Sequence, residues 1–155
     1  MTLIDIPGQT PSLPLGTWLV LSVGGVPLYS ARNLDQTLQP IDAAHVTRRT
    51  VNGTLVDLSV DKFHKYQSKI SCSDVEAPAL DGVFPGMAVT VDCVAELVYK
   101  TAGGTPSRTV IAGSARTVGG FTIYRPRLDM MVVSFNQSIS EYARTVQWEL
   151  DLEEV

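Results

Sequence analysis

The sequence predicts an all-β fold, an antiparallel sandwich or barrel of about seven to nine strands with an extended N-terminal arm. Several segments alternate apolar and polar residues with a period of two, and clusters of Gly, Pro and Asn separate these segments. Only Leu34–Ala44 and Ser138–Tyr142 leave room for a helical turn. We expect residues 1–16 to form the arm and residues 17–155 to form a single β domain, since 155 residues suit one domain.

The prediction of an arm rests on proline. Pro7, Pro11 and Pro14 disfavour a helix over the first residues and favour an extended chain. An extended arm without internal partners is usually ordered by a neighbouring molecule. We therefore expect residues 1–16 to lie on a neighbouring subunit.

Two turns are expected in the first third of the chain. Thr17–Ser22 is rich in β-forming residues, and Gly24-Gly25 after it is a two-residue turn signal that leads to a second run. Asn52-Gly53 lies between two alternating runs, which is the strongest short hairpin signal. We expect a type I′ turn there, with a positive φ at Gly53.

The middle of the chain predicts two strands and a loop. Tyr66–Ser73 alternates, with Ile70 and Cys72 on its apolar face, and Met87–Lys100 alternates over its full length as one strand. Residues 74–86 between them contain two prolines and two glycines, which is typical of a loop.

The last part of the chain is expected to end in a hairpin. The expected elements are a turn at residues 101–107, a short strand at Thr109–Ile111, a loose connection at residues 113–120, a strand at Leu128–Phe135, a polar turn at Asn136–Ser140 and a strand from Tyr142. In the final strand the alternation places four large apolar side chains on one face, Val146, Trp148, Leu150 and Leu152. Burial of this face should stabilise the domain by roughly 1.5–3 kcal/mol per large side chain.

Composition and charge exclude several classes of protein. Apolar residues make up 45% of the chain, which is typical of globular proteins. The net charge is −4, so we expect no nucleic-acid recognition, which needs concentrated Lys and Arg. No run approaches about 18 apolar residues, so no membrane segment is expected. The N-terminal residues lack a basic region and include Asp5, so we expect synthesis in a cytoplasm without secretion.

The two cysteines are expected to be reduced and buried. Cys72 and Cys93 stand 21 positions apart, and His45 and His64 are isolated, whereas a structural zinc site needs four closely paired ligands. Nucleophilic catalysis would need a Cys or Ser beside a His base and an orienting acid, and the sequence has no such pattern. We therefore expect no metal, no cofactor and no enzymatic activity.

Carboxylates gather in two places. Asp74, Glu76 and Asp81 share a loop and could serve a glycosidase or a Ca²⁺ site, but the dense spacing of a Ca²⁺ loop is missing, which favours a solvated loop. The C-terminal ELDLEE segment holds four acids in six residues, spaced to keep Leu150 and Leu152 on the opposite face. A polar strand face is the first interpretation, and an acidic contact surface is the second.

Basic and acidic side chains collect on different segments. A protein with separate surfaces of opposite charge can pair head to tail with copies of itself and close a ring. The candidate subunit interface contains the basic residues Arg48, Arg49, Lys62, Lys65, Lys69, Arg125 and Arg127, and the acidic residues Glu149, Asp151, Glu153 and Glu154.

A resemblance to a known class of proteins is carried by residues 48–155. The segments concerned are RRTVNGTLVDLS, FHKYQSKISCSD, APALDGVFPGMAVTVDCVAEL, and YRPRLDMMVVSF with the closing EYARTVQWELDLEEV. They resemble small β-structural proteins of tailed-bacteriophage virions, in particular tail tube, distal-tail, baseplate and adaptor proteins, and the last pair is similar to their terminal hairpin. The resemblance implies a ring-forming structural subunit located in the virion. It also implies copies of itself and neighbouring virion proteins as partners, commonly with trimeric or hexameric symmetry, and no catalytic residues.

Other functions stay open at this point. A head decoration protein is not separated from a tail protein by the sequence. A carbohydrate- or receptor-binding β-module of a phage particle would need exposed aromatic residues grouped on one surface. The aromatic residues in question are scattered along the chain: Trp18, Tyr29, Tyr66, Phe84, Tyr99 and Tyr124. A small β-barrel enzyme ranks third.

Overall fold

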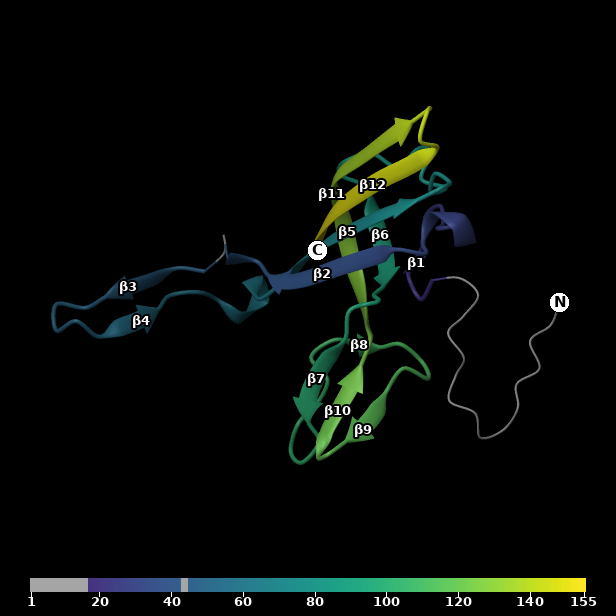
Figure 1. Cartoon of the computed structure of the whole chain (residues 1–155). Coiled ribbons are helices and arrows are strands. Elements are labelled where there is room, and N and C mark those ends of the chain that lie inside the picture. Colours follow the sequence, from purple (N-terminus) through teal and green to yellow (C-terminus); the bar gives the residue numbers. More distant parts are fainter. Residues whose placement is uncertain (1–16, 43–44) are drawn as a thin grey trace.

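The computed structural model describes residues 17–42 and 45–155, and this part of the chain is all-β (Figure 1). It contains twelve strands and two 3-10 turns, η1 (Leu28–Ser30) and η3 (Asp61–Phe63), and no α-helix. The predicted fold class is therefore confirmed. The predicted arm at residues 1–16 lies outside the described residues.

Seven strands form the main antiparallel sheet. Their order is β1 (Val20–Leu21), β6 (Ala88–Asp92), β11 (Pro126–Ser140), β12 (Thr145–Glu154), β5 (Tyr66–Asp74) and β2 (Leu34–Pro40), while β8 (Thr109–Val110) pairs with the start of β11. β11 and β12 form a long hairpin, which agrees with the predicted terminal hairpin.

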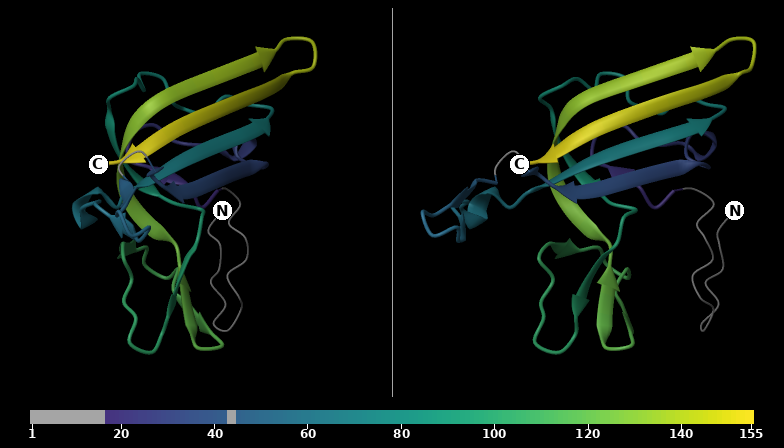
Figure 2. Two further views of the ribbon diagram at one scale, coloured as in Figure 1. Left: turned by 90° about the vertical axis from the view of Figure 1, so that its left-hand side faces the viewer. Right: turned by 60° about the vertical axis from the view of Figure 1, so that its left-hand side comes forward.

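Strand β11 bends the main sheet onto itself, as Figure 2 shows. Its first part pairs with β6, its second part pairs only with β12, and a register shift between Val132 and Ser134 marks a β-bulge. Because of this bend, the buried side chains of β1 and β6 pack against the buried side chains of β5 and β12. One hydrophobic core cluster accordingly joins residues of both halves: Leu21, Val89, Val91, Ile70, Cys72, Leu128, Met130, Val132, Trp148, Leu150 and Leu152.

The predicted buried faces are confirmed. Ile70 and Cys72 of β5 are buried, and so are all four apolar residues named for the final strand. Trp148 is 2% exposed, and its indole N–H donates to the carbonyl oxygen of Ser30 at 2.9 Å. The hydrogen bond pairs the one polar atom of this large side chain inside the core.

Two smaller sheets project from the main sheet in different directions (Figure 1). A three-stranded sheet has the order β7 (Leu97–Lys100), β10 (Phe121–Tyr124) and β9 (Arg116–Val118). A two-stranded ribbon consists of β3 (Thr47–Arg49) and β4 (Leu55–Asp57). We call residues 45–64, which include these strands and η3, the ribbon.

The prediction of a single strand at Met87–Lys100 is wrong. β6 ends at Asp92, and β7 begins at Leu97 in a different sheet. Between them the N–H groups of Val94 and Ala95 donate to Oε1 of Gln36, at 2.6 and 3.1 Å. The alternation still identifies buried side chains through the break, but it does not show which sheet the backbone joins.

Two of the three Gly-Gly pairs do not have the roles that the sequence predicts. Gly24-Gly25 does not turn a hairpin, because Gly25 pairs with Ala79 in an isolated bridge. A Cβ atom on Gly24 would overlap the carbonyl oxygen of Ala79, so this glycine allows a close backbone approach. Gly119-Gly120, expected in a loose connection, instead has positive φ at both residues and turns the β9–β10 hairpin.

Two further turn predictions need correction. Asn136–Ser140 is not a turn but the end of β11, and the chain reverses at residues 141–144, where Arg144 has a φ of 52°. At Asn52-Gly53 the hairpin and the positive φ of Gly53 are confirmed, at 80°. The type I′ geometry is wrong, since Asn52 lacks a positive φ and Gly53 donates to the carbonyl of Thr50, which is typical of a type I turn followed by a bulge.

Candidate functional site

Three of the residues predicted to join copies, Lys69, Glu149 and Arg127, form ion pairs within the same chain across the main sheet. Nζ of Lys69 lies 2.7 Å from Oε1 of Glu149, and this hydrogen bond raises the pKa of Lys69. Arg127 donates to both carboxylate oxygens of Asp92, at 2.6 and 3.0 Å. Exposed pairs of this kind contribute about 0–1 kcal/mol, so they hold side chains in place more than they stabilise the fold.

Glu154 is the most enclosed acid of the predicted interface. Its carboxylate lies 2.7 Å from Nε of Arg108 and accepts a hydrogen bond from the backbone N–H of Tyr66 at 2.9 Å. Arg108 also donates to the carbonyl of His64 and lies 5.0 Å from the centre of the Tyr66 ring. Glu154 therefore ties the end of β12 to the base of the ribbon.

Of the remaining predicted interface residues, Asp151 and Glu153 share one face of the main sheet with Lys69 and Glu149, whereas several basic residues lie elsewhere. Arg48, Arg49 and Lys62 belong to the ribbon, and Arg125 lies 4.9 Å from the Trp18 ring. Asp151 accepts a hydrogen bond from Ser134 at 2.8 Å. Within the described residues, no ion pair involves Arg48, Arg49, Lys62, Lys65, Arg125, Asp151 or Glu153. The predicted residues thus do not form one continuous patch on a single chain.

One face of the main sheet is polar over β2, β5, β12 and the end of β11 from Ser134, whereas Met131 and Val133 of β11 are exposed apolar residues beside it. The cross-strand register brings together Asp35, Thr37 and Gln39 of β2, Gln67, Lys69, Ser71 and Ser73 of β5, Thr145, Gln147, Glu149, Asp151 and Glu153 of β12, and Ser134, Asn136, Ser138 and Ser140 of β11. None of these side chains is apolar or aromatic. The polar strand face predicted for the C-terminal segment is confirmed, and it extends over four strands.

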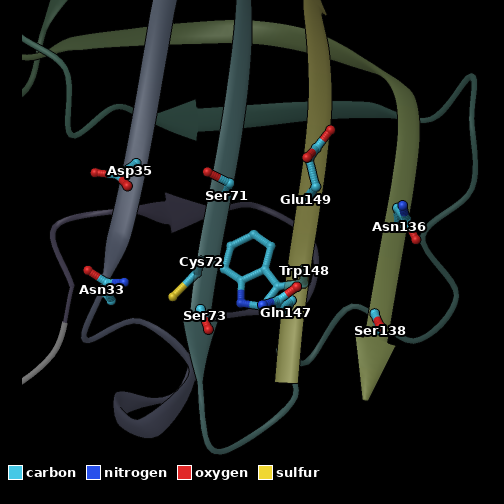
Figure 3. A pocket seen from close by; sticks show the side chains of 10 residues that line it. All are labelled: Asn33, Asp35, Ser71, Cys72, Ser73, Asn136, Ser138, Gln147, Trp148 and Glu149. Carbon is cyan, nitrogen blue, oxygen red and sulfur yellow. The ribbon is translucent and has the colours of Figure 1, made fainter. Parts of the chain in front are cut away.

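A shallow depression of about 290 Å³ lies on this polar face (Figure 3). Short polar side chains surround it, among them Asp35, Ser71, Asn136 and Gln147. Trp148 is drawn beside them, but it is 2% exposed because its ring lies on the core side of the sheet. Ligand pockets in proteins are lined mostly by apolar and aromatic groups, so the depression lacks the stacking surface of a binding pocket.

The ribbon is the most unusual surface. No residue from His45 to His64 is buried. Large apolar side chains are nevertheless exposed along it, and they are Val46, Val51, Leu55, Val56, Leu58, Val60 and Phe63. The alternation after the turn puts Val56, Leu58 and Val60 on one face, and in the described part of the chain they are 37%, 55% and 50% exposed. A lone two-stranded ribbon is marginally stable in water.

A groove of about 610 Å³ lies at the base of the ribbon. His45 and His64, Asp61, Phe63 and Arg108 are among the residues that line it. Nδ1 of His64 lies 3.7 Å from Oδ1 of Asp61, and Nδ1 of His45 lies 3.7 Å from Oδ1 of Asp57. In the part of the chain that the structure describes, no three His, Cys, Asp or Glu side chains are close enough together to hold a metal ion.

The cysteines are buried, as predicted, and both are free thiols. Burial raises the pKa of Cys72, and it raises the pKa of Cys93 to about 11. Both thiols are therefore protonated near neutral pH, whereas a cysteine nucleophile acts as a thiolate.

The acidic loop is less uniform than the sequence suggests. Glu76 and Asp81 are exposed, but Asp74 is buried and receives the guanidinium of Arg32 with a closest distance of 2.6 Å. No sequence pattern indicates this pair, because Arg32 stands in a segment without a clear alternation, 42 positions away.

Comparison with known proteins gave no relative: the chain matches no family model, no curated protein and no solved structure. Among the described residues there is also no helix long and apolar enough to span a membrane.

Proposed function

We propose that this chain is a self-assembling structural subunit of a bacteriophage virion, of the tail, baseplate or tail-adaptor type. The observation that carries the proposal is the ribbon, because it exposes seven large apolar side chains and buries none of its own residues. The resemblance of residues 48–155 to virion tail components supports the same function.

The physical argument starts from the cost of leaving apolar surface in water. Contiguous exposed apolar surface on a folded protein typically marks a contact with another molecule. Leu55, Leu58 and Phe63 are each at least 50% exposed, so covering what remains in water should gain roughly half of the about 1.5–3 kcal/mol that full burial of such a side chain is worth. A ribbon that projects from the main sheet gains this energy only when another subunit covers it (Figure 1).

The other side chains considered for chemistry have structural partners. Both thiols are buried with raised pKa values, Asp74 is held by Arg32, and Glu154 is held by Arg108. The depression on the polar face offers no exposed aromatic ring. These observations favour an assembly function over an enzyme or a sugar-binding module.

The test has two measurements. The purified chain should form assemblies of defined symmetry in electron micrographs. Immunogold labelling should also detect the chain in particles released from cells infected with the phage that encodes it. A chain that stays monomeric at high concentration and is absent from purified particles contradicts the proposal. Labelling of heads instead of tails would support a head decoration protein and overturn the tail assignment.

The ribbon itself is tested by substitution. Leu55→Ser together with Leu58→Ser should weaken assembly and leave the main sheet folded, because neither residue contributes to the core. Val98→Ser is a matched control, since Val98 is 57% exposed on the three-stranded sheet. Equal loss of assembly in the control and in the ribbon variant would count against a specific role of the ribbon.

A further inference from the structure

Within residues 17–42 and 45–155, the main sheet has two long margins without a strand partner. β2 pairs only with β5, and the part of β11 from Ser134 to Ser140 pairs only with β12. These unpaired margins are equally long, because β2 spans seven residues and Ser134–Ser140 also spans seven. They lie on opposite sides of one four-stranded unit, β11-β12-β5-β2 (Figure 2).

The backbone of β2 is oriented for a further strand. The N–H of Ile41 donates to the carbonyl of Lys65, so that Gln39, Thr37 and Asp35 direct their backbone groups to β5. The residues between them direct their backbone groups outward. Pro40 is one of these, and a proline without an N–H group is tolerated in a strand at such an edge position.

The unpaired part of β11 begins where the β-bulge lies. Val132 exchanges backbone hydrogen bonds with Gly86 and Met87, both at 2.8 Å, and no backbone bond on that side follows among the described residues. The strand continues for seven residues beside β12 alone. Ile139 on this stretch is 61% exposed.

The two margins match in direction. Each neighbouring pair in the unit is antiparallel, so its four strands alternate and β2 runs opposite to β11. When the next copy is related by rotation about an axis along the strands, its β11 runs antiparallel to β2 of the first copy. The antiparallel pattern of the sheet then continues across the boundary.

The two margins also match in the faces that they present. On the polar face β2 has Asp35 and Thr37, and β11 has Asn136 and Ser138. On the other face β2 has Leu34 and Leu38, which pack partly against the core, and β11 has Phe135 and Ile139. Gln36 and Gln137 share this second face with the four apolar residues. Pairing of the two margins keeps the polar face continuous and brings the apolar residues of both margins to the other side.

We propose that β2 of one copy pairs with Ser134–Ser140 of the next copy, so that the main sheet passes continuously from subunit to subunit. The partner is a second copy of this chain, and the contact is heterologous, which closes a ring when the rotation closes. Exposed strand edges are templates for such pairing. This inference rests on the proposed function only in assuming that the chain self-assembles.

Other free edges fit the contact less well. β1 and β8 have two residues each, β3, β4 and β9 have three, and β7 has four. Short edges offer few hydrogen bonds and are a common means of avoiding unwanted pairing.

Disulfide formation between introduced cysteines tests the contact. We would prepare Thr37→Cys, Asn136→Cys and Ser138→Cys as single variants and combine Thr37→Cys with each of the other two. All three positions are exposed, and the native cysteines are buried, so the wild-type chain is a clean control. The register between β2 of one copy and β11 of the next is not fixed in advance. Asn136 and Ser138 lie on the same face two positions apart, so together they test two alternative registers of this antiparallel pair.

Under mild oxidation at least one double variant should give a ladder of multimers on a non-reducing gel. A mixture of two single variants should give only the dimer that joins position 37 to position 136 or 138. Dimers of Thr37→Cys alone, or of a β11 variant alone, would reveal a two-fold contact and overturn the proposal.

If the double variants assemble as the wild type does but form no such disulfide, the proposed strand pairing is overturned while the proposed function stays intact. Absence of both disulfides and assemblies would overturn the two together.

A second variant removes an apolar contact of the boundary: Ile139→Lys should weaken self-association by about tenfold or more, since it loses the burial of one large side chain. Val118→Lys, at a similarly exposed apolar residue on the separate three-stranded sheet, should change it by less than about twofold.

Discussion

Arg32 and Asp74 form an ion pair between an exposed guanidinium and a buried carboxylate, and the pair joins the segment just before β2 to the end of β5. The carboxylate of Asp74 accepts hydrogen bonds from the backbone N–H and from the guanidinium of Arg32, at 3.0 and 2.6 Å. The side chain of Asp74 is 3% exposed, whereas that of Arg32 is 52% exposed. Asp74 therefore depends on Arg32 for a counter-charge, and the pair holds β2 against the rest of the sheet.

Arg32→Ala is expected to lower the free energy of unfolding by about 1–3 kcal/mol, because it leaves a buried carboxylate without its charged donor. Urea unfolding followed by tryptophan fluorescence measures the change. Arg48→Ala is the matched control, since Arg48 is exposed and forms no ion pair in the described part of the chain. Equal stability of both variants would contradict a structural role for the pair.

Stability should fall in acid through Asp74. The Arg32 guanidinium lowers the pKa of Asp74 from 3.8 to about 2. A lowered pKa in the folded state means that the pair stabilises the protein fully above the unfolded pKa, and that this contribution disappears as the pH falls towards 2. Asp74→Asn should be less stable at neutral pH and should lose less stability than the wild type between about pH 5 and 2. Parallel pH profiles for the two proteins would exclude this assignment.

Gly24→Ala should destabilise the fold by about 1–3 kcal/mol, because φ at this position is 71° and a methyl group would overlap the carbonyl of Ala79. Gly25→Ala is an adjacent control, since a Cβ atom there meets nothing within 4 Å. It should change stability by less than about 1 kcal/mol. Thermal unfolding of the two variants separates backbone strain from a general effect of alanine.

Gly53→Val should disturb the ribbon without unfolding the main sheet. A β-branched residue at a φ of 80° costs on the order of 1 kcal/mol or more, yet the ribbon contributes no residue to the core. Hydrogen exchange should therefore accelerate at residues 47–57, while the global unfolding midpoint stays unchanged. A large drop in that midpoint would show that the ribbon and the sheet unfold together.

Charge reversal on the polar face tests its role in assembly. Glu149→Lys, Asp151→Lys and Glu153→Lys combined should leave the monomer folded and impair assembly, because these side chains lie outside the core. The Lys69–Glu149 pair provides a control: Lys69→Glu with Glu149→Lys exchanges the two charges and preserves their contact. If the exchanged pair impairs assembly as strongly as the triple variant, the position of each charge is what neighbouring molecules recognise. Normal assembly of the triple variant would remove the polar face from the interface.

Local sequence patterns determined which side chains are buried. The alternation in β5 and β12 correctly named Ile70, Cys72, Trp148 and Leu150, since a period of two follows directly from the geometry of a strand. Asn52-Gly53 correctly marked a hairpin for a similarly local reason. The all-β class needed nothing beyond such patterns and the turn residues between them.

Tertiary structure alone decided which strands pair and which surfaces stay uncovered. Nothing in the alternation of Met87–Lys100 indicates that the chain leaves one sheet at Asp92 and enters another at Leu97, because apolar and polar residues alternate on both sides of the break. The same pattern that is buried in β12 is exposed in the ribbon, where Leu58 and Val60 have no second layer to pack against. Lys69 and Glu149, assigned from their charges to different copies, meet within one chain because β5 and β12 are neighbours. Burial, pairing and charge compensation between distant segments depend on contacts that a local pattern does not encode, so the fold class came from the sequence and the candidate assembly surfaces came from the three-dimensional arrangement.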